Sequence, residues 1–360
     1  RFCDPELMGL GKHIVFLSPG FPENHEDYLC IPPLQAYLPL LRAQYPDCKI
    51  SVIAVHYPYK KQVYQWHDFE IRAVGGKNKR LRKPMAWRGV NQAFKALHKS
   101  QSVDVIHSLW LQECAFLGGK IAAKYKVPHV STIMGQDALP ENRYLPKLKL
   151  DAMRVVAISE RAAEHFSLVS RKDVDAVIPW GIGPEDASWQ PNGKERSIDV
   201  LGVGSLIGLK KYDRWLRVVS ALREKNPNLR AVLVGDGPDR GRLEAMVQDL
   251  KLGKHVEFTG ILPRPKVLDL MAQSKVFVHT ALYEGQGYVF LEALARGMHV
   301  LSCKVGMARE SDKWKLCDHT IDFVEHAKAF LAHPVDEAPR HPIAMQETVA
   351  AYAELYQSAP

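Results

Sequence analysis

The chain has 360 residues, of which 46% are hydrophobic, 24% charged and 9% aromatic. These proportions are typical of a globular protein long enough for two domains, and they argue against a disordered, collagenous or disulfide-rich chain. The net charge of +8 lies entirely in residues 1–180, which carry 25 Lys and Arg against 17 Asp and Glu, whereas residues 181–360 carry 23 of each. This asymmetry indicates an anionic partner for the first half (a membrane surface, a phosphorylated acceptor or a nucleic acid), unless the charge serves only solubility.

The cysteines and the apolar stretches exclude further classes. Six cysteines are scattered without a C-x-x-C pair, which fits a reducing compartment and predicts no zinc site. No stretch approaches 18 uninterrupted apolar residues, so we expect no membrane-spanning helix. The first ten residues lack the apolar core of a signal peptide, although a chain that begins with Arg1 is compatible with a removed upstream segment.

Strands and helices alternate from His13 onward. A strand at 13–18 ends at Pro19-Gly20, and a helix is expected at 34–42. Further short β-branched runs follow, with helical patterns between them, at 49–56, 103–107, 127–133 and 154–158. This alternation predicts parallel βαβ units in a doubly wound sheet.

The alternation restarts after a polar stretch at 183–196. New strands are expected at 198–203, 230–234, 255–259, 276–280 and 299–303. We therefore predict an α/β protein with two Rossmann-like, doubly wound parallel-sheet domains, at 1–182 and 183–336. A segment at 337–360, whose helix spans 345–356, follows a Pro-rich stretch. Ligands of such sheets bind at the carboxyl ends of strands and in the cleft between domains.

The most informative segment is VFVHTALYEGQGYVFLEALARG at 276–297. A strand leads into the turn 284–287, and a helix from Tyr288 is expected to end at Gly297. Glycines in such a turn let backbone N–H groups approach an anion at the helix amino terminus. Glu284 and Glu292, on either side of that array, suit the hydroxyl groups of a sugar or ribose, or else serve as a dipole partner and a helix-face carboxylate.

Glycine turns also follow the other strands. In VLGVGSLIGLKK at 200–211, Lys210 and Lys211 make a phosphate cradle or are solvated lysines beside a tight turn. In the first half, Gly20 follows a strand, His107 ends one, and Asp137 comes shortly after another. The D-x-D spacing at 173–175 lies in a half-apolar run, and we interpret it as chance.

At this point the sequence resembles a known family. The stretch Y-E-G-Q-G-Y-V-F-L-E-A-L-A-R-G is similar to the E-x(7)-E region of retaining glycosyltransferases of family 4 (glycosyl transferases group 1), which have the GT-B fold. Other stretches agree in order and spacing: S-P-G at the start, D-V-I-H at 104–107, G-Q-D at 135–137, V-I-P-W-G at 177–181, L-V-G-D-G-P at 233–238 and V-E-F-T-G at 256–260. The resemblance covers most of the chain and implies two domains that face each other across a cleft. It also implies that the helix M-Q-E-T-V-A-A-Y-A-E-L-Y of segment 337–360 crosses back to the first domain.

The family's roles carry over residue by residue as implications of the resemblance. Glu284 would contact the donor sugar and the reaction centre, Glu292 the nucleotide ribose, and Lys210, with Lys211 beside it, the diphosphate. His107 and Asp137 would lie near the acceptor or the sugar, and with Glu284 and Lys210 they form the predicted catalytic set. The remaining predicted donor-binding positions are Gly20, Ser205, Ile261, Leu262, Gly285, Gly287 and Tyr288.

Three positions depart from the family's pattern. Ser205 stands where many members have an arginine, Met134 where many have histidine, and Trp180 where asparagine is frequent. The missing arginine leaves more of the leaving-group stabilisation to Lys210. The resemblance implies no metal and no cofactor, with a UDP-sugar or GDP-mannose as the donor substrate.

The densest basic cluster precedes and opens a helical stretch in the first half. Its members are Lys77, Lys79, Arg80, Arg82, Lys83 and Arg88, with Trp87 among them. It is expected to hold an anionic membrane surface or an acidic glycan acceptor, and a solvated loop is the alternative. This favours a cytoplasmic protein that is peripheral at the inner face of the membrane.

The sequence thus predicts a retaining, metal-independent glycosyltransferase. It would move a sugar to a hydroxyl of a glycan or lipid-linked acceptor in cell-surface polysaccharide or glycolipid synthesis. A nucleotide-sugar epimerase and a non-catalytic nucleotide-sugar-binding member stay open as alternatives. A nucleic-acid partner is not expected, because no recognised module accompanies the basic cluster.

Overall fold

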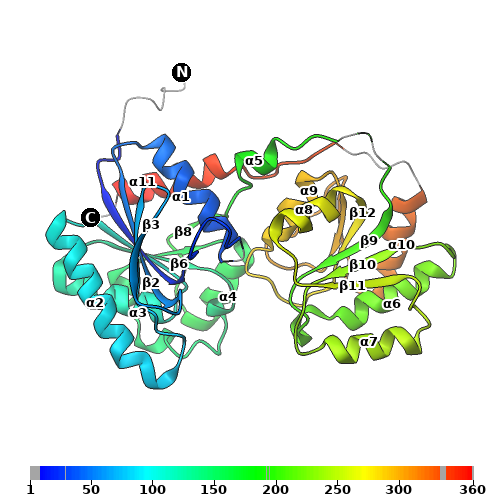
Figure 1. Ribbon diagram of the computed structural model, residues 1–360, viewed down its shortest axis with the longest axis horizontal. Helices are drawn as coiled ribbons and strands as arrows, with labels where there is room; N and C mark the ends of the chain where they lie inside the picture. The colour runs from blue at the N-terminus through cyan, green and yellow to red at the C-terminus, as the bar shows by residue number, and fades with distance from the viewer. Residues whose placement is uncertain (1–8, 29, 192, 194, 333–337, 359–360) are drawn as a thin grey trace. The chain divides into compact units, whose positions relative to one another are not determined.

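A computed structural model describes residues 9–28, 30–191, 193, 195–332 and 338–358, which form two compact units (Figure 1). The first unit comprises residues 1–181 and 345–360, and the second comprises residues 182–344. The leading segment considered for a signal peptide lies mostly outside the described residues. No helix in the described ranges is long and apolar enough to cross a bilayer.

The first unit is built on an eight-stranded sheet in the order β3-β4-β2-β1-β5-β6-β7-β8. Its strands are β1 (His13–Gly20), β2 (Lys49–Tyr57), β3 (Gln62–Trp66), β4 (Phe69–Ala73), β5 (Val105–Leu109), β6 (His129–Ile133), β7 (Arg154–Ala157) and β8 (Ala176–Val177). All pairs are parallel except β3–β4, an antiparallel hairpin at the edge that the sequence analysis did not predict. The prediction of a parallel sheet therefore holds for every strand but β3.

Helices cover both faces of this sheet. They are α1 (Pro32–Gln44), α2 (Lys83–Ser100), α3 (Glu113–Tyr125), α4 (Glu160–Ser170) and α11 (Met345–Gln357). Val15 and Leu17 of β1 pack with α2 and α3, whereas Phe16 between them contacts Tyr37 of α1. Alternate residues of a strand point to opposite faces, so the continuous apolar run of β1 supplies both cores.

The carboxyl-terminal helix α11 belongs to the first unit. Tyr352 and Tyr356 are fully buried there, and the Tyr356 hydroxyl lies 3.1 Å from that of Tyr37. Thr348 accepts a hydrogen bond from the Gly181 N–H and donates one to the Pro179 carbonyl. Residues 338–344 before this helix lie in the second unit, where the Arg340 N–H donates to the Leu294 carbonyl, whereas the helix of the predicted segment 337–360 lies in the first.

The second unit is a six-stranded parallel sheet in the order β11-β10-β9-β12-β13-β14. Its strands are β9 (Ile198–Val203), β10 (Ala231–Val234), β11 (Val256–Gly260), β12 (Ser274–His279), β13 (His299–Ser302) and β14 (Trp314–Leu316). Its helices are α5 (Pro184–Ala187), α6 (Tyr212–Arg223), α7 (Arg240–Asp249), α8 (Arg264–Ala272), α9 (Tyr288–Ala295) and α10 (Thr320–Ala332). One apolar core with Trp215, Phe277 and Trp314 joins the sheet to α6, α7, α8, α9 and α10.

Candidate functional site

The second unit gathers the predicted donor residues at one edge of its sheet. Strands β11, β10, β9 and β12 are neighbours and run parallel, so the segments that follow them emerge along the same edge. These segments hold Ser205 and Lys210 after β9, Ile261 and Leu262 after β11, and the turn 284–287 after β12. Ile261 is exposed, and Leu262 packs partly against the core.

The turn before α9 needs a glycine at position 287. Its φ of +83° is in the left-handed region, and a Cβ there would meet the Phe290 ring at 2.3 Å. Tyr288 begins the helix directly after this glycine, as predicted. The first N–H groups of a helix have no partner within the helix, so this turn offers backbone donors at the carboxyl edge of the sheet.

Glu284 is the centre of a polar cluster beside this turn. Its Oε1 accepts hydrogen bonds from Nζ of Lys210 and from Nε2 of His279, the latter at 2.7 Å. Burial by itself would raise the pKa of Glu284, but the His279 hydrogen bond and the Lys210 charge lower it to about 2. Glu284 is therefore an anion near neutral pH, and it is paired with the Lys210 cation. A diphosphate could compete with Glu284 for this cation.

The loops that carry Lys210 and Glu284 are bonded to each other. The Thr280 hydroxyl donates to the carbonyl oxygens of Lys210 and Lys211, both at 2.9 Å, and the Leu282 N–H donates to Leu209. Lys211 has a left-handed backbone, and its side chain has no hydrogen bond or ion pair with any described residue. The structure thus distinguishes Lys210, which faces Glu284, from its neighbour.

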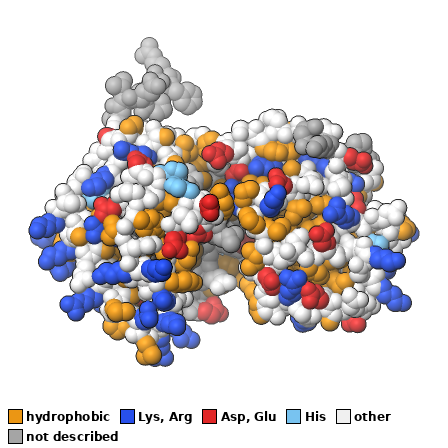
Figure 2. All heavy atoms as spheres, in the orientation of Figure 1, with side chains coloured by type: hydrophobic (Ala, Val, Ile, Leu, Met, Phe, Trp, Pro, Cys, Tyr) orange, Lys and Arg blue, Asp and Glu red, His pale blue; other side chains and the backbone are white. Residues whose placement is uncertain are grey.

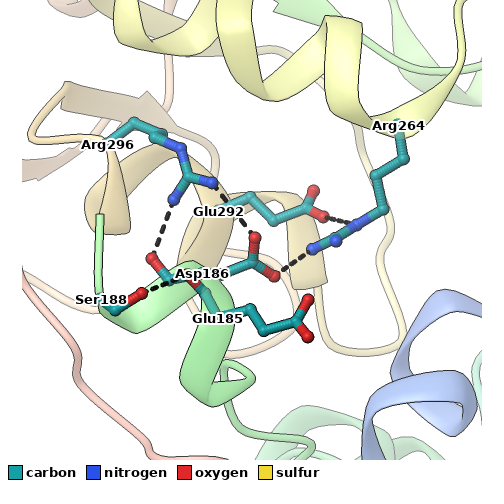
Figure 3. Close-up of polar contacts among 6 residues, drawn as sticks. All are labelled: Glu185, Asp186, Ser188, Arg264, Glu292 and Arg296. Carbon is teal, nitrogen blue, oxygen red and sulfur yellow. Dashed lines mark hydrogen bonds and ion pairs between the residues drawn. The ribbon is translucent and has the colours of Figure 1, made fainter. Parts of the chain in front are cut away.

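Glu292 is held by other side chains of the second unit. Its carboxylate accepts a hydrogen bond from Nε of Arg264 at 2.8 Å, and Arg264 also reaches Oδ2 of Asp186 at 2.6 Å. Arg296 donates to Oδ1 of the same aspartate at 3.1 Å (Figure 3). Burial raises the pKa of Glu292 and the Arg264 charge opposes this. A ribose at Glu292 would therefore share the carboxylate with Arg264.

His107 of the first unit is fully buried. Its Nδ1 lies 2.7 Å from the Tyr356 hydroxyl and its Nε2 lies 2.7 Å from the Thr132 hydroxyl. Burial and the nearby His129 lower the pKa of His107 to about 3, so the ring is neutral near pH 7. Because both ring nitrogens are engaged inside the unit, His107 anchors α11. Its expected place near the acceptor or the sugar stays a prediction.

Asp137 and Gly20 are buried as well. The Asp137 carboxylate accepts N–H bonds from Leu111, Met134 and Gly135, and burial raises its pKa against these donors. It therefore organises the loop after β6, and its predicted catalytic role stays a prediction. Gly20 ends β1, where a Cβ would approach the Tyr57 side chain at 3.4 Å.

The basic cluster divides into exposed and engaged members. Lys79, Arg80, Arg82 and Arg88 are exposed, whereas Lys77 is half-buried. Lys83 Nζ lies 3.1 Å from Glu113, whose pKa is lowered to about 2 as hydrogen bonds from His56, Trp87 and Lys83 outweigh burial. Lys83 is thus largely an internal partner of Glu113, and its place in the predicted surface patch stays a prediction.

Sequence reasoning missed His279, Asp186 and Arg264. His279 is five residues before Glu284 at the end of a strand that was predicted, so its position at the carboxyl edge was a usable signal. Asp186 and Arg264 are 78 residues apart, and nothing local indicates their pairing. No group of three or more His, Cys, Asp or Glu side chains in the described ranges is arranged to hold a metal ion.

Residues 185–313, which include all of this edge, match the model of the family described as glycosyl transferases group 1. The match covers about a third of the chain, and through its second unit the chain is similar to this family. The two parallel-sheet units correspond to the GT-B fold expected from the resemblance.

Two proteins that are similar to this chain are named for lipids. The chain is 27% identical over 167 residues to a component of human phosphatidylinositol N-acetylglucosaminyltransferase, and this match covers 46% of this chain and 34% of that protein. It is 26% identical over 278 residues to the alpha-monoglucosyldiacylglycerol synthase of Streptococcus pneumoniae, covering 67% and 61%. The crystal structure of Anabaena HepE with UDP and glucose superposes with a TM-score of 0.61 at 18% identity, covering 96% and 95%. The chain thus spans about a third of the human relative's length.

Proposed function

We propose that this chain transfers a sugar, with retention and without a metal ion, from a nucleotide-diphosphate sugar to a hydroxyl of a glycan or lipid-linked acceptor. The observation that carries the proposal is the pairing of Lys210 with Glu284 beside the glycine-capped amino terminus of α9. The family match over this edge and the UDP and glucose bound by the Anabaena relative support it. A UDP-sugar or GDP-mannose is the proposed donor.

The reaction breaks the bond between the anomeric carbon and the diphosphate oxygen. Negative charge develops on that oxygen, and Lys210 together with the N–H groups of Gly287 and Tyr288 would stabilise it. For this, Lys210 must exchange Glu284 for the diphosphate. Glu284 would then accept hydrogen bonds from the donor sugar hydroxyls.

The new bond joins the acceptor oxygen to the same face of the anomeric carbon. The acceptor hydroxyl loses its proton to the departing diphosphate oxygen, so no side-chain nucleophile is required. Ser205, where the family often has arginine, adds no charge to the diphosphate site, so Lys210 carries more of the stabilisation.

A donor panel tests the proposal. The purified chain is incubated with UDP-glucose, UDP-N-acetylglucosamine and GDP-mannose together with glycan and lipid acceptors, and nucleotide release and product linkage are measured. Acceptor-dependent release with an α-linked product supports the proposal. Release of a free, epimerised sugar supports an epimerase instead. Nucleotide binding by calorimetry without turnover of any donor indicates a non-catalytic member.

The basic segment of the first unit is the proposed contact with an anionic membrane. Between Glu70 and Asp104 there is no acidic residue, and this interval contains the whole of α2. Within it, Leu81 is 96% exposed and Met85 is 64% exposed, beside the exposed Lys79, Arg80 and Arg82. Figure 2 shows Lys and Arg side chains over this part of the first unit. Exposed apolar side chains among cations fit a bilayer interface better than a free glycan.

Vesicle sedimentation tests this contact. Each cation near an anionic bilayer contributes about 1 kcal/mol, so Lys79, Arg80, Arg82 and Arg88 together provide about 4 kcal/mol at low salt. We expect binding to vesicles that contain phosphatidylglycerol, weaker binding at high salt, and a further loss in Leu81→Ser. Leu168→Ser is the matched control, because Leu168 is 79% exposed on α4 of the same unit. An equal loss of vesicle binding in Leu81→Ser and Leu168→Ser contradicts the membrane contact, as does a wild type that does not bind vesicles.

A further inference from the structure

His279 lies where the core of the second unit meets the donor edge. It is the last residue of β12, and only 3% of its side chain is exposed. The Phe290 ring packs edge-on against the imidazole at 4.9 Å, and the Phe277 ring stacks on it at 5.9 Å. These contacts restrict the ring to one orientation, with Nε2 2.7 Å from Oε1 of Glu284.

Two donors share one oxygen of Glu284. Nζ of Lys210 and Nε2 of His279 both contact Oε1, and within the described part of the chain no group donates to Oε2. If a diphosphate takes Lys210 away, His279 is the side chain that still holds Oε1. Oε2 is then the oxygen left for a donor hydroxyl.

The surroundings keep His279 a neutral donor and Glu284 an anion. Burial lowers the pKa of His279, and the Lys210 charge lowers it further against the effect of Glu284. A neutral imidazole with its proton on Nε2 donates to the carboxylate. Tyr212 of α6 also faces Glu284, and burial and the Glu284 charge keep it neutral by raising its pKa.

We propose that His279 is a positioning residue, which fixes Oε1 of Glu284 while Lys210 binds the donor diphosphate and so directs Oε2 to a hydroxyl of the donor sugar. This role rests on the proposed sugar transfer. It assigns His279 no contact with the substrate. Its effect passes entirely through the orientation and charge of Glu284.

The test compares His279→Leu, which removes the donor, with His279→Gln, whose amide N–H can replace Nε2–H. Using a donor that the wild type turns over, we expect His279→Leu to lower kcat about 10–100-fold with little change in the donor KM, as is usual when a residue that orients a functional group is lost. We also expect the acidic limb of its kcat profile to move to higher pH, and His279→Gln to recover most of the rate. His299→Leu is the matched control, since His299 stacks on Phe330 and pairs with Val276 near the opposite end of β12.

A titration that needs no turnover complements the kinetics. In Lys210→Met protein, the carboxyl signal of Glu284 is followed by ¹³C NMR and assigned with Glu284→Gln. Adding His279→Leu should raise the pKa of Glu284, because burial is then unopposed. If His279→Leu does not fold, His279→Gln is compared with His279→Asn, whose shorter amide cannot reach Oε1.

The outcomes separate the two proposals. Unchanged kcat, pH profile and Glu284 titration in His279→Leu overturn the positioning role, as does equal impairment of the leucine and glutamine variants, which would show packing alone. A wild type that turns over no nucleotide-sugar overturns the proposed function, while the titration still decides whether His279 controls Glu284.

Discussion

Replacing Lys210 with alanine removes the only cation that the structure, over its described residues, places on Glu284. The lysine and the glutamate are 17% and 16% exposed, so both are largely shielded from solvent. In the alanine variant Glu284 keeps its hydrogen bond to His279, so the second unit should still fold. We expect a stability loss of about 1–2 kcal/mol, less than for a buried charge left without any partner.

The expected loss of activity is larger than the loss of stability. Removing one donor from a developing oxyanion costs about 10²–10³ in kcat, or roughly 3–4 kcal/mol. The charge-assisted hydrogen bond to the bound diphosphate contributes about 1.5–3 kcal/mol, so affinity for free UDP or GDP should fall about 10–100-fold. The pKa of Glu284 should rise from about 2, because the Lys210 charge is the second of the influences that lower it.

Nucleotide release, product formation and calorimetric UDP or GDP binding measure these effects. Lys251→Ala is the control, since Lys251 is exposed beyond the end of α7 and, like Lys211, has a left-handed backbone. Lys211→Ala tests the choice between the adjacent lysines. It should lose less rate and less nucleotide affinity than Lys210→Ala. Wild-type rate and nucleotide affinity in Lys210→Ala would refute the assignment of the diphosphate to this edge.

Three further predictions concern the two units separately. The pKa of Glu113 is lowered from 4.5 to about 2, so its contribution to stability, about 3 kcal/mol, is present above pH 4.5 and lost as the pH falls toward 2. In urea titrations, the free energy of unfolding of Glu113→Gln should depend less on pH in this window than that of the wild type. Tyr356→Phe should destabilise the first unit by about 1–3 kcal/mol, because Nδ1 of His107 is left unpaired, and a wild-type denaturation midpoint would contradict this anchoring of α11. Gly287→Ala should abolish UDP or GDP binding, since a Cβ meets Phe290 at 2.3 Å, whereas Gly241→Ala has open space and should bind normally.

Patterns that span a few residues determined the architecture and the donor turn. The alternation of apolar strands with helical stretches predicted two parallel α/β units, and the glycines around Glu284 predicted the start of α9 at Tyr288. Both follow from local physics, because side-chain periodicity and backbone conformation are set by neighbours along the chain. The edge hairpin of β3 and β4 was not predicted. Its strands alternate buried and partly exposed residues and contain no continuous buried run of the kind used to predict the other strands.

The partners of the functional side chains were decided only by tertiary structure. Lys210 and Glu284 are 74 residues apart and meet because β9 and β12 are neighbours in the sheet, an order that no local pattern encodes. Arg264 reaches Glu292 and Asp186 because α8 and α5 both pack against α9. His107 is at the end of a predicted strand, where a side chain is expected at the edge of the sheet. It is nevertheless covered by α11, whose Tyr356 is 249 residues later in the chain. The sequence by itself therefore determined which residues follow which strands, and the packing of distant segments decided which of their polar atoms remain free for chemistry.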